Sequence, residues 1–287
     1  MADDRVIPIL ESIRDVGADR KAWLVDIWGV IHNGVEAFEE SVTACAAFRK
    51  TGGFVVLVTN APRPSPSVVE QLDRIGVQRD AYDAVVTSGD VTRGLINAWR
   101  DRAIHHLGPE RDVPLFSDLD IKLVPSIDAE IIVCTGLEND EVETPETYRR
   151  TLERLLRRRA LMICANPDKK VERGNTIVYC AGALGALYEE MGGDTVYAGK
   201  PHGPIYELAM GIVRDACGAG TQLSDVLAIG DGVLTDIRGA TDFGLQSVFV
   251  GSGIHLSPED WTPEAVTSVF TDHPEARPLA ALPRLRW

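Results

Sequence analysis

Short continuous runs of apolar residues, each ending in a polar residue, restrict the fold of this chain more than any other feature. Residues 54–58 read Phe-Val-Val-Leu-Val before Thr59, and residues 226–229 read Val-Leu-Ala-Ile before Gly230-Asp231. A strand that is apolar at every position is typical of a parallel sheet covered on both faces. Because parallel strands need crossover connections, which are usually helices, these runs predict an α/β fold.

The apolar runs recur in two stretches at opposite ends of the chain. We expect strands at residues 22–25, 54–58 and 84–87 in the first stretch, and at residues 226–229 and 247–250 in the second. Helical patterns lie between them. This alternation predicts a Rossmann-like, doubly wound parallel sheet with right-handed crossovers.

The middle of the chain is organised differently. It contains several short strand candidates with helices between some of them: residues 115–116, 122–124, 131–133 and 161–164. We therefore predict one sheet domain made of residues 1–88 and 196–287, with a second α/β domain inserted at residues 89–195.

Charge and composition exclude several classes of protein. The net charge of -14 argues against nucleic acid as a partner, although a local site on an acidic protein still accepts a small anion. The five scattered cysteines include no C-x-x-C pair, which favours a reduced compartment. The acidic N-terminus lacks the pattern of a signal peptide, and no apolar run approaches the length of a membrane span. We expect a soluble, cytoplasmic protein with no membrane partner.

Polar residues end three of the expected strands: Asp26, Thr59-Asn60 and Gly230-Asp231. The carboxyl ends of parallel strands line one crevice, where ligands usually bind. Two carboxylates in that crevice repel each other unless a cation lies between them, and Mg²⁺ suits oxygen ligands with open positions. Asp236, five residues after Asp231, is able to face the same ion, and Lys200 follows another strand, where its charge would neutralise a phosphate.

Four segments, taken in order, carry a family resemblance: Asp26-Ile27-Trp28-Gly29-Val30, Thr59-Asn60, Gly199-Lys200-Pro201 and Gly-Asp-Gly-Val-Leu-Thr-Asp at residues 230–236. Together they resemble the haloacid dehalogenase (HAD) superfamily of phosphatases. The set is most similar to subclass IIA, which includes sugar, p-nitrophenyl and pyridoxal phosphate phosphatases. In the insert the resemblance rests on residues 165–168 and on the Gly-rich residues 181–185. The Gly-rich segment lacks the spacing of a dinucleotide fingerprint, so we expect a helix start packed closely on its neighbours.

The resemblance implies a role for each acidic residue. Asp26 would attack phosphorus and form an aspartyl-phosphate, which splits one difficult displacement into two steps. Mg²⁺ would be held by Asp26, by the backbone carbonyl of Trp28 and by Asp231. Asp236 would be a further ligand or would act through a water molecule.

The resemblance also implies that the sheet domain is a catalytic core and that the inserted α/β domain is a cap, which would exclude water and contribute substrate contacts on closing. Thr59, the backbone amide of Asn60 and Lys200 would bind the phosphoryl oxygens. Three residues are candidates for further substrate contacts: Arg63, Asn166 and Asp168. The alternative for Arg63 is a solvated loop residue, and the alternative for the Asn166-Pro167-Asp168 segment is an ordinary turn.

One position departs from the family pattern. Phosphatases of this family usually carry a second Asp two residues after the nucleophile, where it protonates the leaving oxygen, but this chain has Trp28 there. Trp28 either fills core volume or forms a wall of the substrate pocket. His32 is our candidate for the missing acid, with substrate contact and a structural hydrogen bond in a loop as its alternatives. His255 is a weaker candidate.

The motifs together favour one function, and Trp28 leaves two alternatives to it. The chain would be a Mg²⁺-dependent hydrolase of small phosphate monoesters, such as a sugar phosphate, an aryl phosphate or a phosphorylated cofactor. Its partner would be a small phosphorylated metabolite, and because members of the subclass are often dimers, the resemblance allows a homodimer. Trp28 motivates the alternatives, which are a catalytically weak or silent protein that binds a phosphorylated ligand, and a phosphotransferase.

Overall fold

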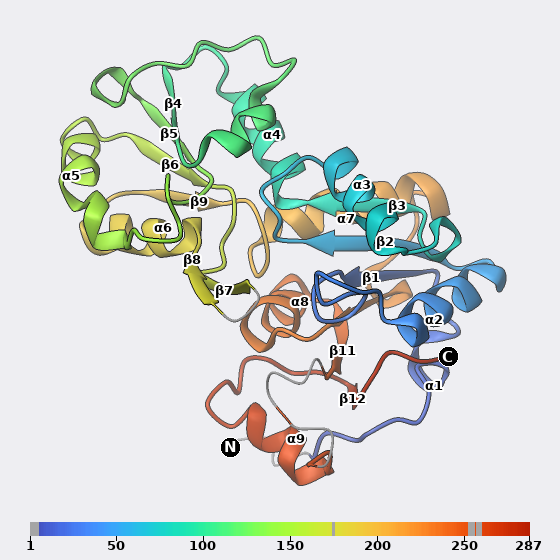
Figure 1. The fold of residues 1–287 in the computed structure, drawn as a ribbon. Coiled ribbons are helices and arrows are strands. Elements are labelled where there is room, and N and C mark those ends of the chain that lie inside the picture. The colour runs from blue at the N-terminus through green and yellow to red at the C-terminus, as the bar shows by residue number, and fades with distance from the viewer. Residues whose placement is uncertain (1–5, 174–175, 252–255, 257–259) are drawn as a thin grey trace. The chain divides into compact units, whose positions relative to one another are not determined.

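The computed structural model describes residues 6–173, 176–251, 256 and 260–287, and it confirms the predicted α/β fold class (Figure 1). By its internal contacts the chain divides into two compact units. The first comprises Met1–Thr59, Val68–Val86 and Tyr206–Trp287, and the second comprises Asn60–Ser67 and Thr87–Ile205. His255 lies outside the described residues. Among the helices that are described, none combines the length and apolar character needed to cross a membrane.

The first unit is built on a six-stranded sheet in the order β12-β11-β10-β1-β2-β3. Its strands are β1 (Ala22–Asp26), β2 (Phe54–Thr59), β3 (Ala84–Thr87), β10 (Val226–Gly230), β11 (Gln246–Val250) and β12 (Ala280–Leu282). The pairs β1–β2, β1–β10, β10–β11 and β11–β12 are parallel. Every residue of β1 and β10 is buried, as their uninterrupted apolar sequences predict.

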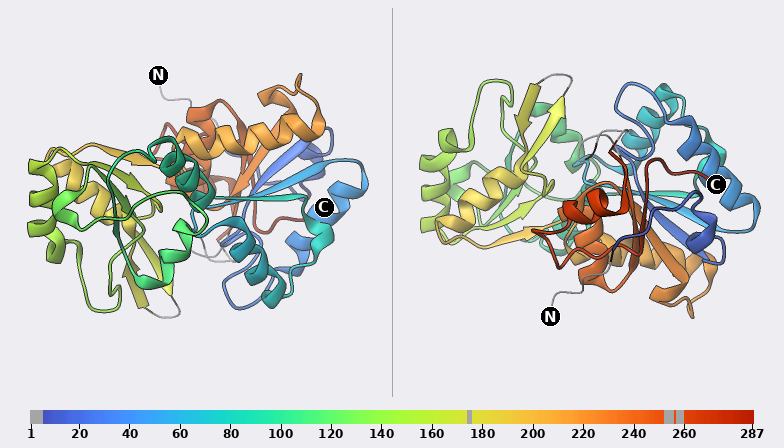
Figure 2. Two further views of the ribbon diagram at one scale, coloured as in Figure 1. Left: turned by 90° about the horizontal axis from the view of Figure 1, so that it is seen from above. Right: turned by 90° about the horizontal axis from the view of Figure 1, so that it is seen from below.

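Helices cover both faces of this sheet (Figure 2). They are α1 (Arg14–Gly17), α2 (Glu39–Lys50), α3 (Ser65–Ile75), α7 (Gly203–Cys217), α8 (Arg238–Phe243) and α9 (Pro263–Val269). The Trp23 ring, fully buried on β1, stacks on Phe48 of α2 with ring centroids 4.0 Å apart. A Cβ on Gly53 would lie 2.3 Å from the Phe48 ring, so the glycine that follows α2 is needed for this stack.

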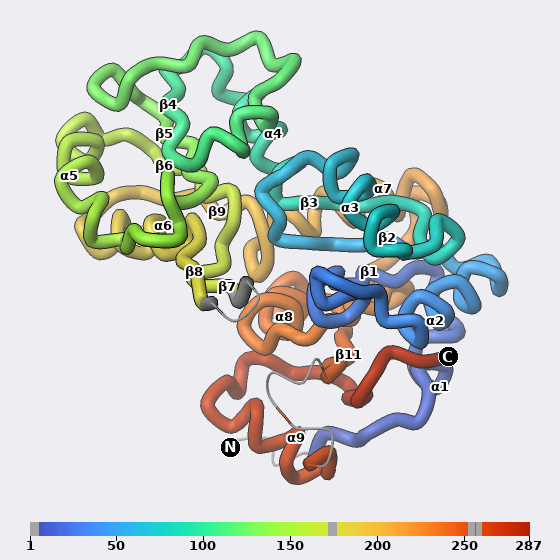
Figure 3. The backbone as a smooth tube through the Cα atoms, viewed as in Figure 1, coloured from blue at the N-terminus to red at the C-terminus, as the bar shows by residue number. Residues whose placement is uncertain are grey.

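The described segments nearest the two ends of the chain, residues 8–13 and 280–286, are joined by hydrogen bonds in the first unit (Figure 3). Leu10 donates a backbone hydrogen bond to the carbonyl of Ala281 in β12, and Ala281 donates one to Pro8. Ile13 makes a similar bond to Arg286. The core sheet is thus built from the N-terminal and C-terminal parts of the chain, and the inserted segment lies between these parts in the sequence.

The second unit has its own parallel sheet in the order β4-β5-β6-β9, together with a two-stranded antiparallel hairpin. The strands are β4 (Ile104–Leu107), β5 (Ile131–Cys134), β6 (Leu161–Cys164), β9 (Thr195–Tyr197), and β7 (Lys170–Arg173) with β8 (Thr176–Tyr179) in the hairpin. Its helices are α4 (Ser88–Ala98), α5 (Arg149–Arg157) and α6 (Ala181–Glu190). One apolar cluster joins α5 and α6 to the sheet, and a second joins α4 to it.

Two strand predictions in this unit are wrong. Leu115 and Phe116 end a 3₁₀ segment, η2 (Glu110–Phe116). Pro114, inside this segment, has no backbone N–H to donate to a neighbouring strand. Leu123 makes only an isolated bridge to Ile104. Runs of two or three apolar residues are too short to distinguish a strand from a buried turn.

The unit bounds differ from the domain bounds predicted above. Residues 60–67, 87–88 and 196–205, which we assigned to the core from the sequence, pack with the second unit. Asn60 and Lys200, in two of these segments, are hydrogen-bonded to each other, and Asn60 is also bonded to Asp168. The division into catalytic core and cap therefore stays a prediction, with these three connecting segments as the open point.

Candidate active site

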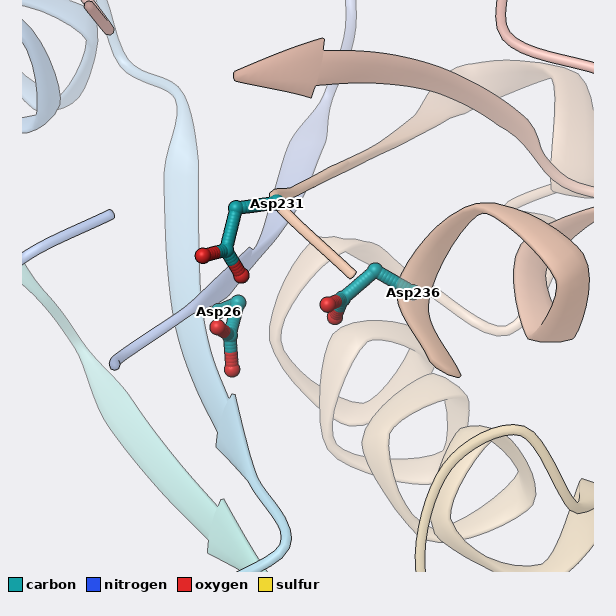
Figure 4. A group of neighbouring side chains, drawn as sticks. All are labelled: Asp26, Asp231 and Asp236. Atoms are coloured by element: carbon teal, nitrogen blue, oxygen red, sulfur yellow. The ribbon is translucent and has the colours of Figure 1, made fainter. Parts of the chain in front are cut away.

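Three buried carboxylates meet at one edge of the core sheet (Figure 4). Asp26 is the last residue of β1, Asp231 directly follows β10, and Asp236 lies in the π-helical turn η6 (Val233–Ile237). Each offers an oxygen within 4.8 Å of the other two. The proximity follows from register, because Val25 pairs with Ile229 across the central strands. The pair of acidic strand ends expected from the sequence is therefore present, and Asp236 joins it.

Two glycines make the turn around Asp236 feasible. A Cβ on Gly230 would lie 2.3 Å from the Asp236 side chain, and a Cβ on Gly232 would lie 1.9 Å from Thr235 Oγ1. The Gly232 carbonyl accepts hydrogen bonds from the amides of Asp236 and Ile237 at 2.9 and 3.0 Å. The Gly232 amide in turn donates to Asp236 Oδ2 at 3.0 Å, and this fixes the carboxylate.

The composition of this acidic cluster fits a divalent cation. Asp26, Asp231 and Asp236 provide only oxygen donors, and all three are buried. Carboxylates taken out of water and crowded together are unfavourable unless a positive charge lies among them. Oxygen ligands in this number suit Mg²⁺, which completes its shell with water and substrate oxygens. The Trp28 carbonyl, two residues after Asp26, remains a predicted ligand.

His32 is held inside the loop that follows β1. Its side chain is buried, and its Nδ1 accepts a hydrogen bond from the Gly34 amide at 2.9 Å. An Nδ1 that accepts leaves the proton of the neutral ring on Nε2. Burial lowers the pKa of His32 to about 4. This environment favours the structural hydrogen bond among the three alternatives, while the acid-base role stays a prediction.

The Trp28 ring is exposed beside His32. Its side chain is 45% exposed, so it does not fill core volume. The ring meets the His32 ring edge-on, with centroids 5.5 Å apart. Gly34, at φ 90°, leaves the space that the ring occupies, because a Cβ there would lie 2.3 Å from it. These contacts argue against the first alternative, core filling, and a role as a wall of the substrate pocket stays a prediction.

The second unit brings together three predicted residues. Asn60 Nδ2 donates to Asp168 Oδ1 and to the Lys200 carbonyl, both at 3.0 Å, and Lys200 N donates to Asn60 Oδ1 at 2.7 Å. A Cβ on Gly199 would lie 2.4 Å from Asn60 Oδ1, so this junction requires glycine. Asn60 and Lys200 are buried. The side chain of Asn60 thus positions the Lys200 segment, a role that the sequence did not reveal.

The remaining predicted residues lie at separate places. Thr59 is buried at the end of β2, in the first unit. Arg63 and Asn166 line a cavity of about 360 Å³ within the second unit. The same cavity contains Asp112 and Asp140, which sequence reasoning missed. Asp112 follows residues 104–107, which were not recognised as a strand because two histidines interrupt the apolar pattern, and Asp140 follows the predicted strand at residues 131–133 without a motif around it.

Comparisons with known proteins agree with this arrangement. Residues 23–122 match the family described as haloacid dehalogenase-like hydrolase, and residues 197–276 match the one described as HAD-hydrolase-like. A crystal structure of a haloacid dehalogenase-like family hydrolase from Brucella suis 1330 is 45% identical, with a TM-score of 0.85 over 96% of this chain and 100% of that chain.

Two further proteins are more distant. A p-nitrophenyl phosphatase from Archaeoglobus fulgidus is 23% identical, with a TM-score of 0.72 over 93% of this chain and 97% of that chain. The 5'-nucleotidase YutF of Bacillus subtilis (strain 168) is 23% identical over 242 residues, which are 82% of this chain and 88% of the relative. These findings confirm the resemblance to the haloacid dehalogenase superfamily that the motifs indicate. The chain belongs to the haloacid dehalogenase-like hydrolase family.

Proposed function

We propose that this chain is a Mg²⁺-dependent phosphatase that hydrolyses small phosphate monoesters through an aspartyl-phosphate on Asp26. The observation that carries the proposal is the buried cluster of Asp26, Asp231 and Asp236 in a chain of this family. Relatives named as a p-nitrophenyl phosphatase and a 5'-nucleotidase support phosphate-ester chemistry.

The first chemical step follows from the position of Asp26 at the end of β1. One carboxylate oxygen of Asp26 forms a bond to phosphorus while the bond from phosphorus to the leaving oxygen breaks. Water then attacks the phosphorus, the bond to the Asp26 oxygen breaks, and inorganic phosphate leaves. Lys200 and Thr59 bind the phosphoryl oxygens through both steps.

Asp231 and Asp236 would hold Mg²⁺ together with Asp26. A bound Mg²⁺ ion supplies positive charge that screens the phosphate from the attacking carboxylate and stabilises the charge of the transition state. Asp236 is fixed for this role by the hydrogen bond from the Gly232 amide.

The leaving oxygen lacks the usual proton donor. Trp28 occupies that position and has no titratable group, and general acid catalysis is typically worth about 10²–10⁴-fold. His32 is a poor substitute, because its pKa is lowered to about 4 by burial and its Nδ1 is bonded to Gly34. We therefore expect faster turnover of esters whose leaving group is stable as an anion.

Release of p-nitrophenolate from p-nitrophenyl phosphate tests the proposal. Turnover should require Mg²⁺ and stop on addition of EDTA, and Asp26→Asn should lower kcat by at least about 10³-fold. Asp272→Asn, an exposed acidic residue of the same unit, is the matched control and should retain wild-type turnover. Metal-independent turnover, or full activity of Asp26→Asn, would refute the assignment.

The same environment of Trp28 and His32 favours one alternative, a protein that binds a phosphorylated ligand with little or no turnover. Calorimetric titration with a non-hydrolysable phosphonate, alongside the turnover assay, separates the two. Tight binding with no release of phosphate from any monoester would favour the silent protein. A stable phospho-Asp26, detected by intact mass, would favour the phosphotransferase.

A further inference from the structure

A run of arginines on the second unit takes no part in the proposed chemistry. Six arginines and one glutamate lie within residues 149–159, so this segment carries a net charge of +5 in a chain whose net charge is -14, and the rest of the chain carries -19. The segment comprises α5 and the two residues after it, and α5 lies at the periphery of the second unit (Figure 1). Positive charge gathered on an otherwise acidic chain forms a local surface that attracts anions.

The arginines of α5 form one side of the helix. Arg150, Arg154 and Arg157 follow each other at intervals of four and three residues, which places them on one face. All three are exposed, whereas Leu152 and Leu155 on the opposite side are buried in an apolar cluster of the second unit. The guanidinium groups therefore extend from a helix that is fixed by its other face.

Most of this positive charge is not neutralised within the chain. Arg149 is paired with Glu146, and Arg154 donates to the Thr151 hydroxyl at 3.1 Å. Among the residues that the structure describes, no carboxylate forms an ion pair with the three exposed arginines of the helix or with Arg159. Their guanidinium groups are therefore available to a ligand.

The helix dipole accounts for only part of the run. Cations stabilise the last turn of a helix, and in α5 that turn contains Arg154 and Arg157. Arg150 lies earlier in the helix, and the effect of the dipole is confined to the terminal turns. A role at the helix end therefore does not explain the whole arginine face.

Arg159 has a backbone conformation that usually belongs to glycine. Its φ is 56°, and the amide of the next residue, Ala160, donates to the Leu155 carbonyl at 3.2 Å, as in a helix ending of the Schellman type. A side chain is unfavourable at positive φ, so an arginine kept there points to a use for its charge. With the helix face it makes up a set that we call the arginine surface: Arg150, Arg154, Arg157 and Arg159.

We propose that the arginine surface binds an acidic segment of a partner protein. Guanidinium groups pair with carboxylates through two parallel hydrogen bonds. The arginines of the helix are spaced by about 5–6 Å along its axis. Alternate side chains of an extended peptide are spaced by about 6.6 Å. An extended segment with acidic residues at alternate positions therefore matches the helix face, and its binding is independent of the proposed phosphatase function.

A short acidic segment suits this surface better than an extended polyanion. Charges act over about 8 Å at physiological ionic strength, so a short peptide that lies on α5 meets mainly the arginines. A nucleic acid strand or an anionic membrane extends further and also meets the charge of -19 on the rest of the chain. The surface thus selects its ligand by size as well as by charge.

A fluorescein-labelled peptide with glutamate alternating with alanine tests the proposal, by fluorescence anisotropy with the full chain. The Kd should rise several-fold between about 50 and about 300 mM NaCl, and the peptide with glutamine in place of glutamate should not bind. The triple variant Arg150→Gln/Arg154→Gln/Arg157→Gln should raise the Kd at least about 10-fold, because each exposed pair contributes modestly and three are lost.

A charge-matched variant is the control. Lys50→Gln/Arg74→Gln/Arg277→Gln removes the same charge from exposed residues of the first unit and should change the Kd less than about 2-fold. All six positions are exposed, so both triple variants should keep the circular dichroism spectrum of the wild type.

Arg159→Gly gives a second readout. Because glycine suits a φ of 56°, the melting temperature should rise, while the loss of one charge should raise the Kd of the glutamate peptide about 2–3-fold. An unchanged Kd would contradict the role assigned to Arg159.

Three results would overturn the proposal. The first is that the glutamate peptide does not bind, and the second is that the control triple variant loses as much affinity as the helix variant. The third is that an oligouridylate or phosphatidylserine vesicles bind through the same three arginines more tightly than the peptide does at about 150 mM salt, which would assign the surface to a nucleic acid or to a membrane.

Discussion

Asp236→Asn separates the electrostatic cost of the acidic cluster from its metal-binding role. The oxygens of Asp26, Asp231 and Asp236 lie within 4.8 Å of one another. Two unit charges at that distance repel by about 1 kcal/mol in the dielectric of water and by about 3.5 kcal/mol at an effective dielectric near 20. Asn at position 236 removes two of the three repulsive pairs and keeps an oxygen for the Gly232 amide. We expect the metal-free variant to be more stable than the wild type by about 2 kcal/mol or more.

Magnesium should reverse this order. A ligand at 100 times its Kd adds about 2.7 kcal/mol to the free energy of unfolding of a protein that binds it only when folded. The wild type should gain stability of this size in excess Mg²⁺, whereas Asp236→Asn, with one carboxylate fewer, should gain clearly less. The measurement is urea denaturation in EDTA and in millimolar Mg²⁺, with Asp272→Asn as a matched control that should follow the wild type in both. If Asp236→Asn is no more stable than the wild type in EDTA, the repulsion among the three carboxylates is refuted. If Mg²⁺ does not raise the stability of the wild type, the metal site is refuted.

Three other changes test separate parts of the structure. Trp28→Asp supplies the missing acid and should raise kcat for glycerol 3-phosphate by about 10²-fold. The kcat for p-nitrophenyl phosphate should change by less than about 3-fold, because its leaving group needs no proton. Equal effects on the two substrates in a steady-state assay would contradict a proton-transfer role at position 28. Because burial lowers the pKa of His106 from 6.5 to about 4, the unfolded chain binds its proton more readily, so stability falls by up to roughly 3 kcal/mol as pH drops from above 6.5 to about 4. His106→Gln should flatten that decline in urea denaturation across this pH range, and an unchanged slope would show that other groups cause it. Gly182→Ala would place a Cβ 2.0 Å from the Pro167 carbonyl oxygen and should lower the free energy of unfolding by about 1–3 kcal/mol. Gly211→Ala has open space around the new Cβ in α7 and should leave the free energy of unfolding unchanged or raise it by about 0.5–1 kcal/mol. Similar melting temperatures for the two variants would contradict the close packing at Gly182.

The sheet of the first unit was predictable because its strands are buried on both faces. Residues 54–58 and 226–229 contain no polar position, and each becomes a strand, β2 and β10, extended by one residue. The second unit was less predictable. Its first strand, β4, contains His105 and His106, and these are accepted because the His105 ring bonds the Val124 carbonyl and His106 bonds Thr135. Such partners come from other elements, and a local pattern does not contain them.

The residues of the candidate site also differ in how far the sequence predicts them. Asp26 and Asp231 could be predicted together because each follows a buried parallel strand, and parallel strands end at a common edge. The Gly-rich segment was also predicted as a closely packed helix start, and it begins α6 with Gly182 against the loop of Asn166-Pro167-Asp168. The side-chain role of Asn60 depends instead on Lys200, which lies far along the sequence and reaches Asn60 only through the fold.

The missing acid bears on the choice of ester. A sugar or polyol leaves as a poor anion, so it needs the proton that Trp28 cannot give, while p-nitrophenolate needs none. Trp28→Asp should therefore narrow the difference in kcat between p-nitrophenyl phosphate and glycerol 3-phosphate. A difference that stays unchanged would mean that position 28 takes no part in protonation of the leaving group.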